Sequence, residues 1–209
     1  MSSILGVALA LMSLSVAHAA TTATDAPLVI FLGDSLTAGY GLPGDHAFPS
    51  RVAETLRTRG KPIRAVNAGV SGDTTTGALE RLDWLLKQRP DVLVVELGAN
   101  DAFRGHPVAR IEANLREIVR RAKAGGARVL VLGMRLPTNY GPDYANAFAA
   151  IYARVARDEH VELMPFLLED VGGHAELNLG DGIHPNESGE KIVADHVVPY
   201  LERVLGAVR

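Results

Sequence analysis

Leu28-Val29-Ile30-Phe31-Leu32-Gly33-Asp34-Ser35-Leu36 is the stretch that decides the fold. Its first five residues are apolar and rich in branched side chains, which is typical of a buried strand, and Gly33 marks the turn that ends the strand. Residues 35–39 can begin a helix whose amides face Ser35. In an open α/β sheet, ligands bind at the carboxyl ends of the strands. Ser35 is therefore a candidate nucleophile, and a plain turn or capping residue is the alternative.

Short apolar runs and helical periodicity alternate along the rest of the chain. Strands are expected at 28–32, 63–67, 92–96, 128–132 and 161–163, and helices at 48–59, 73–88, 107–124, 143–158 and 188–205. Strands that are joined by helical crossovers form a parallel sheet with both faces covered. The sequence therefore predicts an α/β fold, a flavodoxin-like three-layer α/β/α sandwich around a parallel sheet of about five strands.

Composition limits the function classes. The chain has 209 residues, a formal net charge of -3 and no cysteine. A basic footprint for nucleic acid is missing, so nucleic acid is not expected as a partner. Disulfides, cysteine-ligated metals, a cysteine nucleophile and a lipid-modified cysteine anchor are excluded.

The N-terminal residues form a separate segment. An uncharged, mostly apolar run over 4–17 precedes Ala17-His18-Ala19-Ala20, so residues 1–19 are predicted to be a secretory signal peptide. No Lys or Arg precedes the run, which leaves open a start upstream of Met1. The run is shorter than the ~20 residues of a spanning helix, so no stable membrane anchor is expected. Residues 20–27 are a polar tether and 28–209 a single domain, expected to be an exported, periplasmic monomer. Secretion from the cell and a cytoplasmic protein with an apolar leader are the alternatives.

Two further strand ends carry unusual residues. Gly72 precedes a helix that Asp73 is expected to cap, and Asn100 follows the third strand. A backbone N–H at a helix start and a neutral side-chain donor are the components of an oxyanion hole. We expect the amides of Ser35 and Gly72 and the side chain of Asn100 to supply them. Turn geometry for Gly72 and a cap for Asn100 are the alternatives.

A candidate base follows near the end of the chain, in Asp181-Gly182-Ile183-His184-Pro185. An acid three residues before His184 can fold back within the turn and orient its imidazole. Pro185 is expected to open the last helix. The alternative is an exposed loop histidine beside a capping aspartate.

Together these segments resemble the four conserved blocks of the SGNH (GDSL) hydrolase superfamily. The blocks are Gly33-Asp34-Ser35-Leu36, Gly72 within Ser71-Gly72-Asp73, Gly98-Ala99-Asn100-Asp101 and Asp181-x-x-His184. The bacterial thioesterase I, lysophospholipase and arylesterase group is similar also over 95–98, 135–141 and 181–186. The resemblance implies a serine hydrolase in which Ser35 is the nucleophile, His184 the base and Asp181 its orienting acid. It also implies the oxyanion hole of Ser35, Gly72 and Asn100, and no metal or organic cofactor is expected. Asp34 and Asp101 belong to the blocks, and we interpret them as structural hydrogen-bonding partners that are not members of the triad.

The resemblance also implies small-molecule acyl ester or thioester substrates, including aryl esters, lysophospholipids and acyl thioesters. Leu136, Pro137 and Tyr140 are the candidate substrate-binding residues, with Phe166, Leu167 and Leu168 as further apolar lining. Ordinary packing is the alternative for each. A carbohydrate O-acetyl esterase on the same fold and a non-catalytic binding module are the alternative functions.

Overall fold

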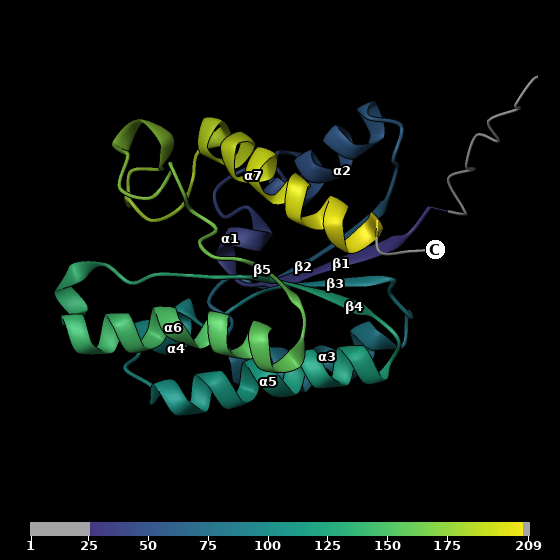
Figure 1. The fold of residues 1–209 in the computed structure, drawn as a ribbon. Coiled ribbons are helices and arrows are strands. Elements are labelled where there is room, and N and C mark those ends of the chain that lie inside the picture. The colour runs from purple at the N-terminus through teal and green to yellow at the C-terminus, as the bar shows by residue number, and fades with distance from the viewer. Residues whose placement is uncertain (1–25, 207–209) are drawn as a thin grey trace, which may run out of the picture.

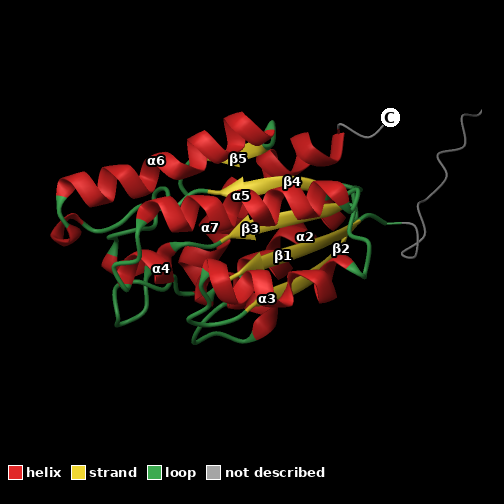
Figure 2. Cartoon of the chain, turned by 90° about the horizontal axis from the view of Figure 1, so that it is seen from below, coloured by secondary structure: helices red, strands yellow, loops and turns green. Residues whose placement is uncertain are grey.

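The computed structural model of the protein describes residues 26–206, in which five parallel strands form one sheet. The strands are β1 (Leu28–Gly33), β2 (Arg64–Gly69), β3 (Val92–Glu96), β4 (Arg128–Leu132) and β5 (Glu162–Met164), in the spatial order β2-β1-β3-β4-β5. Figure 2 shows the arrows of the sheet running in one direction beneath the helices. The predicted flavodoxin-like sandwich is confirmed. The predicted signal peptide and residues 20–25 of the tether lie outside the described residues.

Helices cover both faces of the sheet (Figure 1). One face carries α1 (Ser35–Ala38), α2 (Phe48–Thr58) and α7 (Glu187–Gly206); the other carries α3 (Thr75–Leu86), α4 (Ala99–Phe103), α5 (Val108–Ala124) and α6 (Pro142–Glu159). Short 3₁₀ turns lie at Gly44–His46, Thr138–Tyr140 and Ala175–Leu177. Within residues 26–206, no helix has both the length and the apolar character that crossing a membrane requires.

The pattern of buried side chains explains why these segments form strands or helices. β1 and β3 are buried along their whole length, whereas the edge strand β2 is partly exposed. Continuous apolar runs belong to the centre of a sheet that is covered on both faces. On α5, residues three and four positions apart are buried and pack on the sheet: Ile111, Leu115, Ile118, Val119 and Ala122.

The structure corrects three local expectations. Thr74, not Asp73, caps α3, because its side chain accepts a hydrogen bond from the amide of Gly77. Asp73 instead pairs with Arg81 at 2.8 Å. The last helix begins at Glu187 after Asn186, whose side-chain oxygen accepts from the amides two and three residues later, so Pro185 does not open it. The short helix α4 was not expected at all.

The register of the sheet places the segments that follow β1, β2 and β3 next to one another. Gly33, the last residue of β1, pairs with Gly69 of β2 on one side and with Glu96 of β3 on the other. The segments leaving β1, β2 and β3 therefore begin side by side at the carboxyl edge of the sheet. This is the edge at which open α/β sheets bind their ligands.

Candidate active site

A chain of two hydrogen bonds joins three residues at this edge. Nε2 of His184 lies 2.9 Å from Oγ of Ser35, and its Nδ1 lies 2.7 Å from Oδ2 of Asp181. The serine and the histidine are half-buried, and the aspartate is exposed. The structure thus brings together the three residues that the sequence singled out as nucleophile, base and acid.

The tight turn that precedes α7 places the acid against the base. Oδ1 of Asp181 accepts hydrogen bonds from the amides of Ile183 and His184, at 2.9 and 3.0 Å. These bonds, with that from the His184 side chain, lower the pKa of Asp181 to about 2. An ionised carboxylate can only accept, so Nδ1 of His184 carries the proton that is donated to it. Nε2 is then free to accept the proton of Ser35 Oγ.

Asp34 fixes both the start of α1, which carries Ser35, and the side chain of Asn100. One of its oxygens accepts from the amide of Leu36 at 3.0 Å, which caps α1. The other accepts from Nδ2 of Asn100 at 2.9 Å. The amide of Asn100 has two N–H donors, so the bond to Asp34 orients the group and leaves the second N–H available. Asp34 therefore has the structural role that was expected for it.

Gly72 lies in the turn after β2, and its φ of +80° is in the left-handed region that favours glycine. The turn is tied to β1 because the amide of Val70 donates to the carbonyl of Gly33 at 3.0 Å. Within residues 26–206, the amides of Gly72 and Ser35 have no hydrogen-bond acceptor. Two backbone donors and one side-chain donor of segments that leave the carboxyl edge of the sheet are thus without a partner among the described residues, and such donors are the components of an oxyanion hole.

Three further side chains support this edge of the sheet. The sequence indicated no role for two of them, Arg104 and Tyr40. Arg104 donates to the carbonyl of Gly72 at 3.0 Å. The ring of Tyr40 lies against the ring of His184, with centroids 4.4 Å apart. Asp101 accepts from both the amide and the hydroxyl of Thr75, at 2.8 and 2.7 Å, and so ties α4 to the first turn of α3.

The residues that were expected to form an apolar lining differ in their exposure to solvent. Pro137 and Tyr140 are exposed, Leu136 is half-buried, and Tyr140 stacks on Phe103 with centroids 5.6 Å apart. Leu167 and Leu168 belong to the hydrophobic core, so the expectation that they line the cleft was wrong. Both follow the short strand β5, and the amide of Leu167 donates to the carbonyl of Gly133 at 2.9 Å, which ties this segment to the end of β4.

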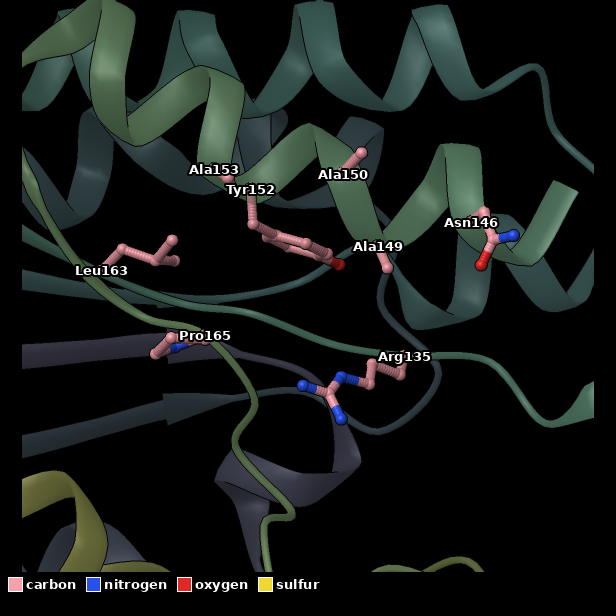
Figure 3. Close-up of a pocket in the computed structure, with 8 residues that line it drawn as sticks. All are labelled: Arg135, Asn146, Ala149, Ala150, Tyr152, Ala153, Leu163 and Pro165. Carbon is pink, nitrogen blue, oxygen red and sulfur yellow. The ribbon is translucent and has the colours of Figure 1, made fainter. Parts of the chain in front are cut away.

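A cavity of about 320 Å³ lies between α6 and the ends of β4 and β5 (Figure 3). Alanines of α6, Leu163, Pro165 and Arg135 line it, but none of Ser35, Asp181 and His184 does. Tyr152 forms one wall and donates from its hydroxyl to the carbonyl of Leu97 at 3.0 Å. The cavity wall is therefore connected to the segment that carries Asn100.

The profile of the GDSL-like Lipase/Acylhydrolase family matches residues 31–192. The chain belongs to this family. Esterase TesA of Pseudomonas aeruginosa is 40% identical over 181 residues, 86% of this chain and 90% of that protein. An arylesterase of Vibrio mimicus is 40% identical over 188 residues, 90% of this chain and 93% of the relative.

Thioesterase 1/protease 1/lysophospholipase L1 of Escherichia coli K12 is 39% identical over 86% of both chains. Among solved structures, a crystal structure of TesA has a TM-score of 0.82 at 40% identity and covers 85% of this chain and 99% of its own. The psychrotrophic esterase EstA of Pseudoalteromonas sp. also has a TM-score of 0.82, at 32% identity, covering 86% and 99%. These relatives and structures are named as esterases, an arylesterase and a thioesterase/protease/lysophospholipase.

Proposed function

We propose that this protein is a serine esterase and thioesterase that transfers acyl groups to water through an acyl-enzyme. The observation that carries the proposal is the bridge formed by His184, 2.9 Å from Ser35 Oγ and 2.7 Å from Asp181. A hydroxyl nucleophile, a base in contact with it and an acid that orients the base are the parts of an activated serine.

In the first half of the reaction, Nε2 of His184 takes the proton of Ser35 Oγ, and Oγ attacks the acyl carbonyl. The carbonyl oxygen becomes an oxyanion, which accepts hydrogen bonds from the amides of Ser35 and Gly72 and from Asn100. Asp181, kept ionised by its low pKa, stabilises the imidazolium. The carbonyl reforms when the bond to the alcohol or thiol breaks, and His184 protonates that leaving group.

In the second half, water replaces the leaving group. His184 removes a proton from water, the resulting hydroxyl attacks the Ser35 ester, and the oxyanion forms in the same place. His184 returns the proton to Ser35 Oγ as the carboxylic acid leaves, so the enzyme is regenerated. Every step uses groups of the chain and water.

The substrate class is supported by the relatives and by the surroundings of the site. The relatives are named esterase, arylesterase and thioesterase/lysophospholipase. Large exposed hydrophobic side chains follow the carboxyl edge of the sheet, among them Tyr40, Val70, Phe103, Tyr140 and Ile183. We expect Leu136, Pro137 and Tyr140 to contact the acyl chain of aryl esters, lysophospholipids and acyl thioesters.

The test is hydrolysis of p-nitrophenyl esters from acetate to palmitate by wild type, Ser35→Ala and Ser188→Ala. Ser188 is an exposed serine at the start of α7, so its variant is the matched control. We expect Ser35→Ala to lower kcat on the order of 10⁴ to 10⁶-fold and Ser188→Ala to retain activity. Undiminished hydrolysis by Ser35→Ala would refute the mechanism. Activity restricted to acetate would favour the carbohydrate O-acetyl esterase, and inactivity of wild type the binding module.

The destination of the protein is a separate part of the proposal. We expect removal of residues 1–19 on export to the periplasm, leaving 28–209 as a single monomeric domain behind a short tether. Expression of the full chain, followed by N-terminal sequencing of the periplasmic fraction, tests this. A mature N-terminus at Ala20 is expected, and full-length protein confined to the cytoplasm would contradict it.

A further inference from the structure

Two carboxyl groups are buried together below the candidate oxyanion hole. Asp34 and Glu96 each expose only 1% of their surface. Within residues 26–206 neither forms an ion pair with a cation. Two unpaired buried negative charges are far more costly than one, so a single proton shared by the pair is favoured.

The hydrogen bonds identify the residue that carries this proton. Each oxygen of Asp34 accepts a bond, from the Leu36 amide and from Asn100, which stabilises the ionised form. On Glu96, Oε2 accepts from the Asp34 amide at 3.2 Å and from the Thr37 hydroxyl at 2.9 Å. Its Oε1 is buried without a partner. A proton on Oε1 converts that atom into a donor.

Asp34 is the neighbouring acceptor for such a proton, because its amide is bonded to Oε2 of Glu96 and each carboxyl shifts the pKa of the other. Burial raises the pKa of Asp34 too, against the opposing effects of its hydrogen bonds and of the His184 charge. Burial and the neighbouring Asp34 raise the pKa of Glu96 well above its ordinary value. Tyr152 of α6 is the other titratable group beside Glu96; burial, followed by the charges of Glu96 and Asp34, raises the pKa of its phenol. A neutral Glu96 therefore faces one ionised neighbour, Asp34, and one neutral phenol.

We propose that Glu96 is a positioning residue, which as a protonated acid donates to Asp34 and thereby holds Asn100 in place for the oxyanion. Glu96 acts at a distance from substrate. Its hydrogen bonds connect the end of β3 with the cap of α1, and Asp34 passes this constraint to the Asn100 amide. The inference rests on the proposed function for its effect on catalysis, whereas the protonation state of Glu96 does not depend on it.

The variants Glu96→Gln and Glu96→Leu test whether the hydrogen-bond donor of Glu96 is what matters. Neither variant can ionise, and only the glutamine has a donor. The glutamine keeps an oxygen that accepts from Asp34 and Thr37, and its NH₂ group replaces the acid as donor. We expect kcat within about threefold of wild type. The leucine has a similar volume and no donor, so kcat is expected to fall about 10²-fold at unchanged KM, as for the loss of one oxyanion donor.

A double-mutant cycle tests whether the effect passes through Asn100. In an Asn100→Ala background, Glu96→Leu should lower kcat by no more than about threefold, because the group that it positions is already gone. An equal loss in both backgrounds would overturn the positioning role. Thermal unfolding of each variant establishes that it is folded.

Infrared difference spectroscopy of wild type against Glu96→Gln at neutral pH keeps the proposal testable if the leucine variant fails to fold. Loss of a carboxylic-acid carbonyl band is expected, and loss of carboxylate bands would overturn the protonated state. Glu190→Gln serves as the reference, because burial raises the pKa of that carboxyl to about 8. Failure of the proposed function would be seen separately, as full activity of Ser35→Ala with the infrared result unchanged.

Discussion

Glu190 on the first turn of α7 is a buried acid whose removal should stabilise the protein. Its side chain accepts from the amide of Phe48 at 2.6 Å, which joins α7 to the start of α2, and only 2% of the residue is exposed. Burial raises its pKa from the ordinary 4.5 to about 8, against the opposing effects of the Phe48 hydrogen bond and the charge of Arg51. Glu190→Gln keeps the acceptor and abolishes the titration.

The direction in which stability changes with pH follows from the difference between the folded and unfolded pKa values of Glu190. Because the folded-state pKa is the higher one, the contribution of the neutral acid is complete below 4.5 and is lost as the pH rises toward 8. Each pH unit between these values costs about 1.4 kcal/mol. Between about pH 5 and about pH 7, the free energy of unfolding of Glu190→Gln should therefore rise relative to wild type by about 2 to 3 kcal/mol.

Urea unfolding of both proteins at the two pH values measures this difference. Glu187→Gln is the control, since Glu187 lies on the same turn, is 60% exposed and pairs with His46 at 2.6 Å. The difference in free energy of unfolding between Glu187→Gln and wild type should change by less than about 1 kcal/mol between the two pH values, because an exposed ion pair contributes little. A difference between Glu190→Gln and wild type that is the same at both pH values would refute the reasoning.

Three further changes address the site and its support. Asp181→Asn should lower kcat about 10³ to 10⁴-fold, because an amide no longer selects the productive tautomer of His184; steady-state kinetics with unchanged activity would exclude this role. Asn100→Ala should lower kcat about 10² to 10³-fold with KM nearly constant, and a change confined to KM would contradict an oxyanion donor. Gly69→Ala would place Cβ 2.3 Å from the amide nitrogen of Ala38, so we expect a loss of about 1 to 3 kcal/mol in urea unfolding, whereas an unshifted midpoint would show that α1 can move aside.

The sequence predicted the sheet well because its central strands are continuous apolar runs. The bounds of β3 and β4 agree with the expected 92–96 and 128–132. The edge strand β2 extends two residues beyond the expected end, because pairing with β1 carries it to Gly69 although its own residues are only partly buried. Tertiary pairing, which a local pattern does not contain, sets its length.

For the candidate site, the motif residues and the supporting roles of Asp34 and Asp101 were predicted, but the supports outside the four blocks were not. Ser35, Asp181 and His184 could be singled out because their chemistry and local context are distinctive. Arg104 and Glu96 act on atoms of Gly72 and Asp34 that are distant in sequence, so no local spacing indicates them. A charged residue ending the aliphatic strand β3 was the one available signal for Glu96. Leu167 and Leu168 were misplaced because an apolar side chain looks the same in a cleft and in a core.

The order of the elements along the chain has a consequence for biosynthesis. Ser35 follows the first strand, whereas its hydrogen-bond partner His184 lies 149 residues later, on the turn that precedes α7. The turn is held because α7 packs against α2, β4 and β5. A chain that leaves the ribosome from its N-terminus therefore presents the proposed nucleophile long before the proposed base is synthesised. In the proposed mechanism, hydrolysis begins only when α7 has docked, so activity reports that this last helix is folded in place.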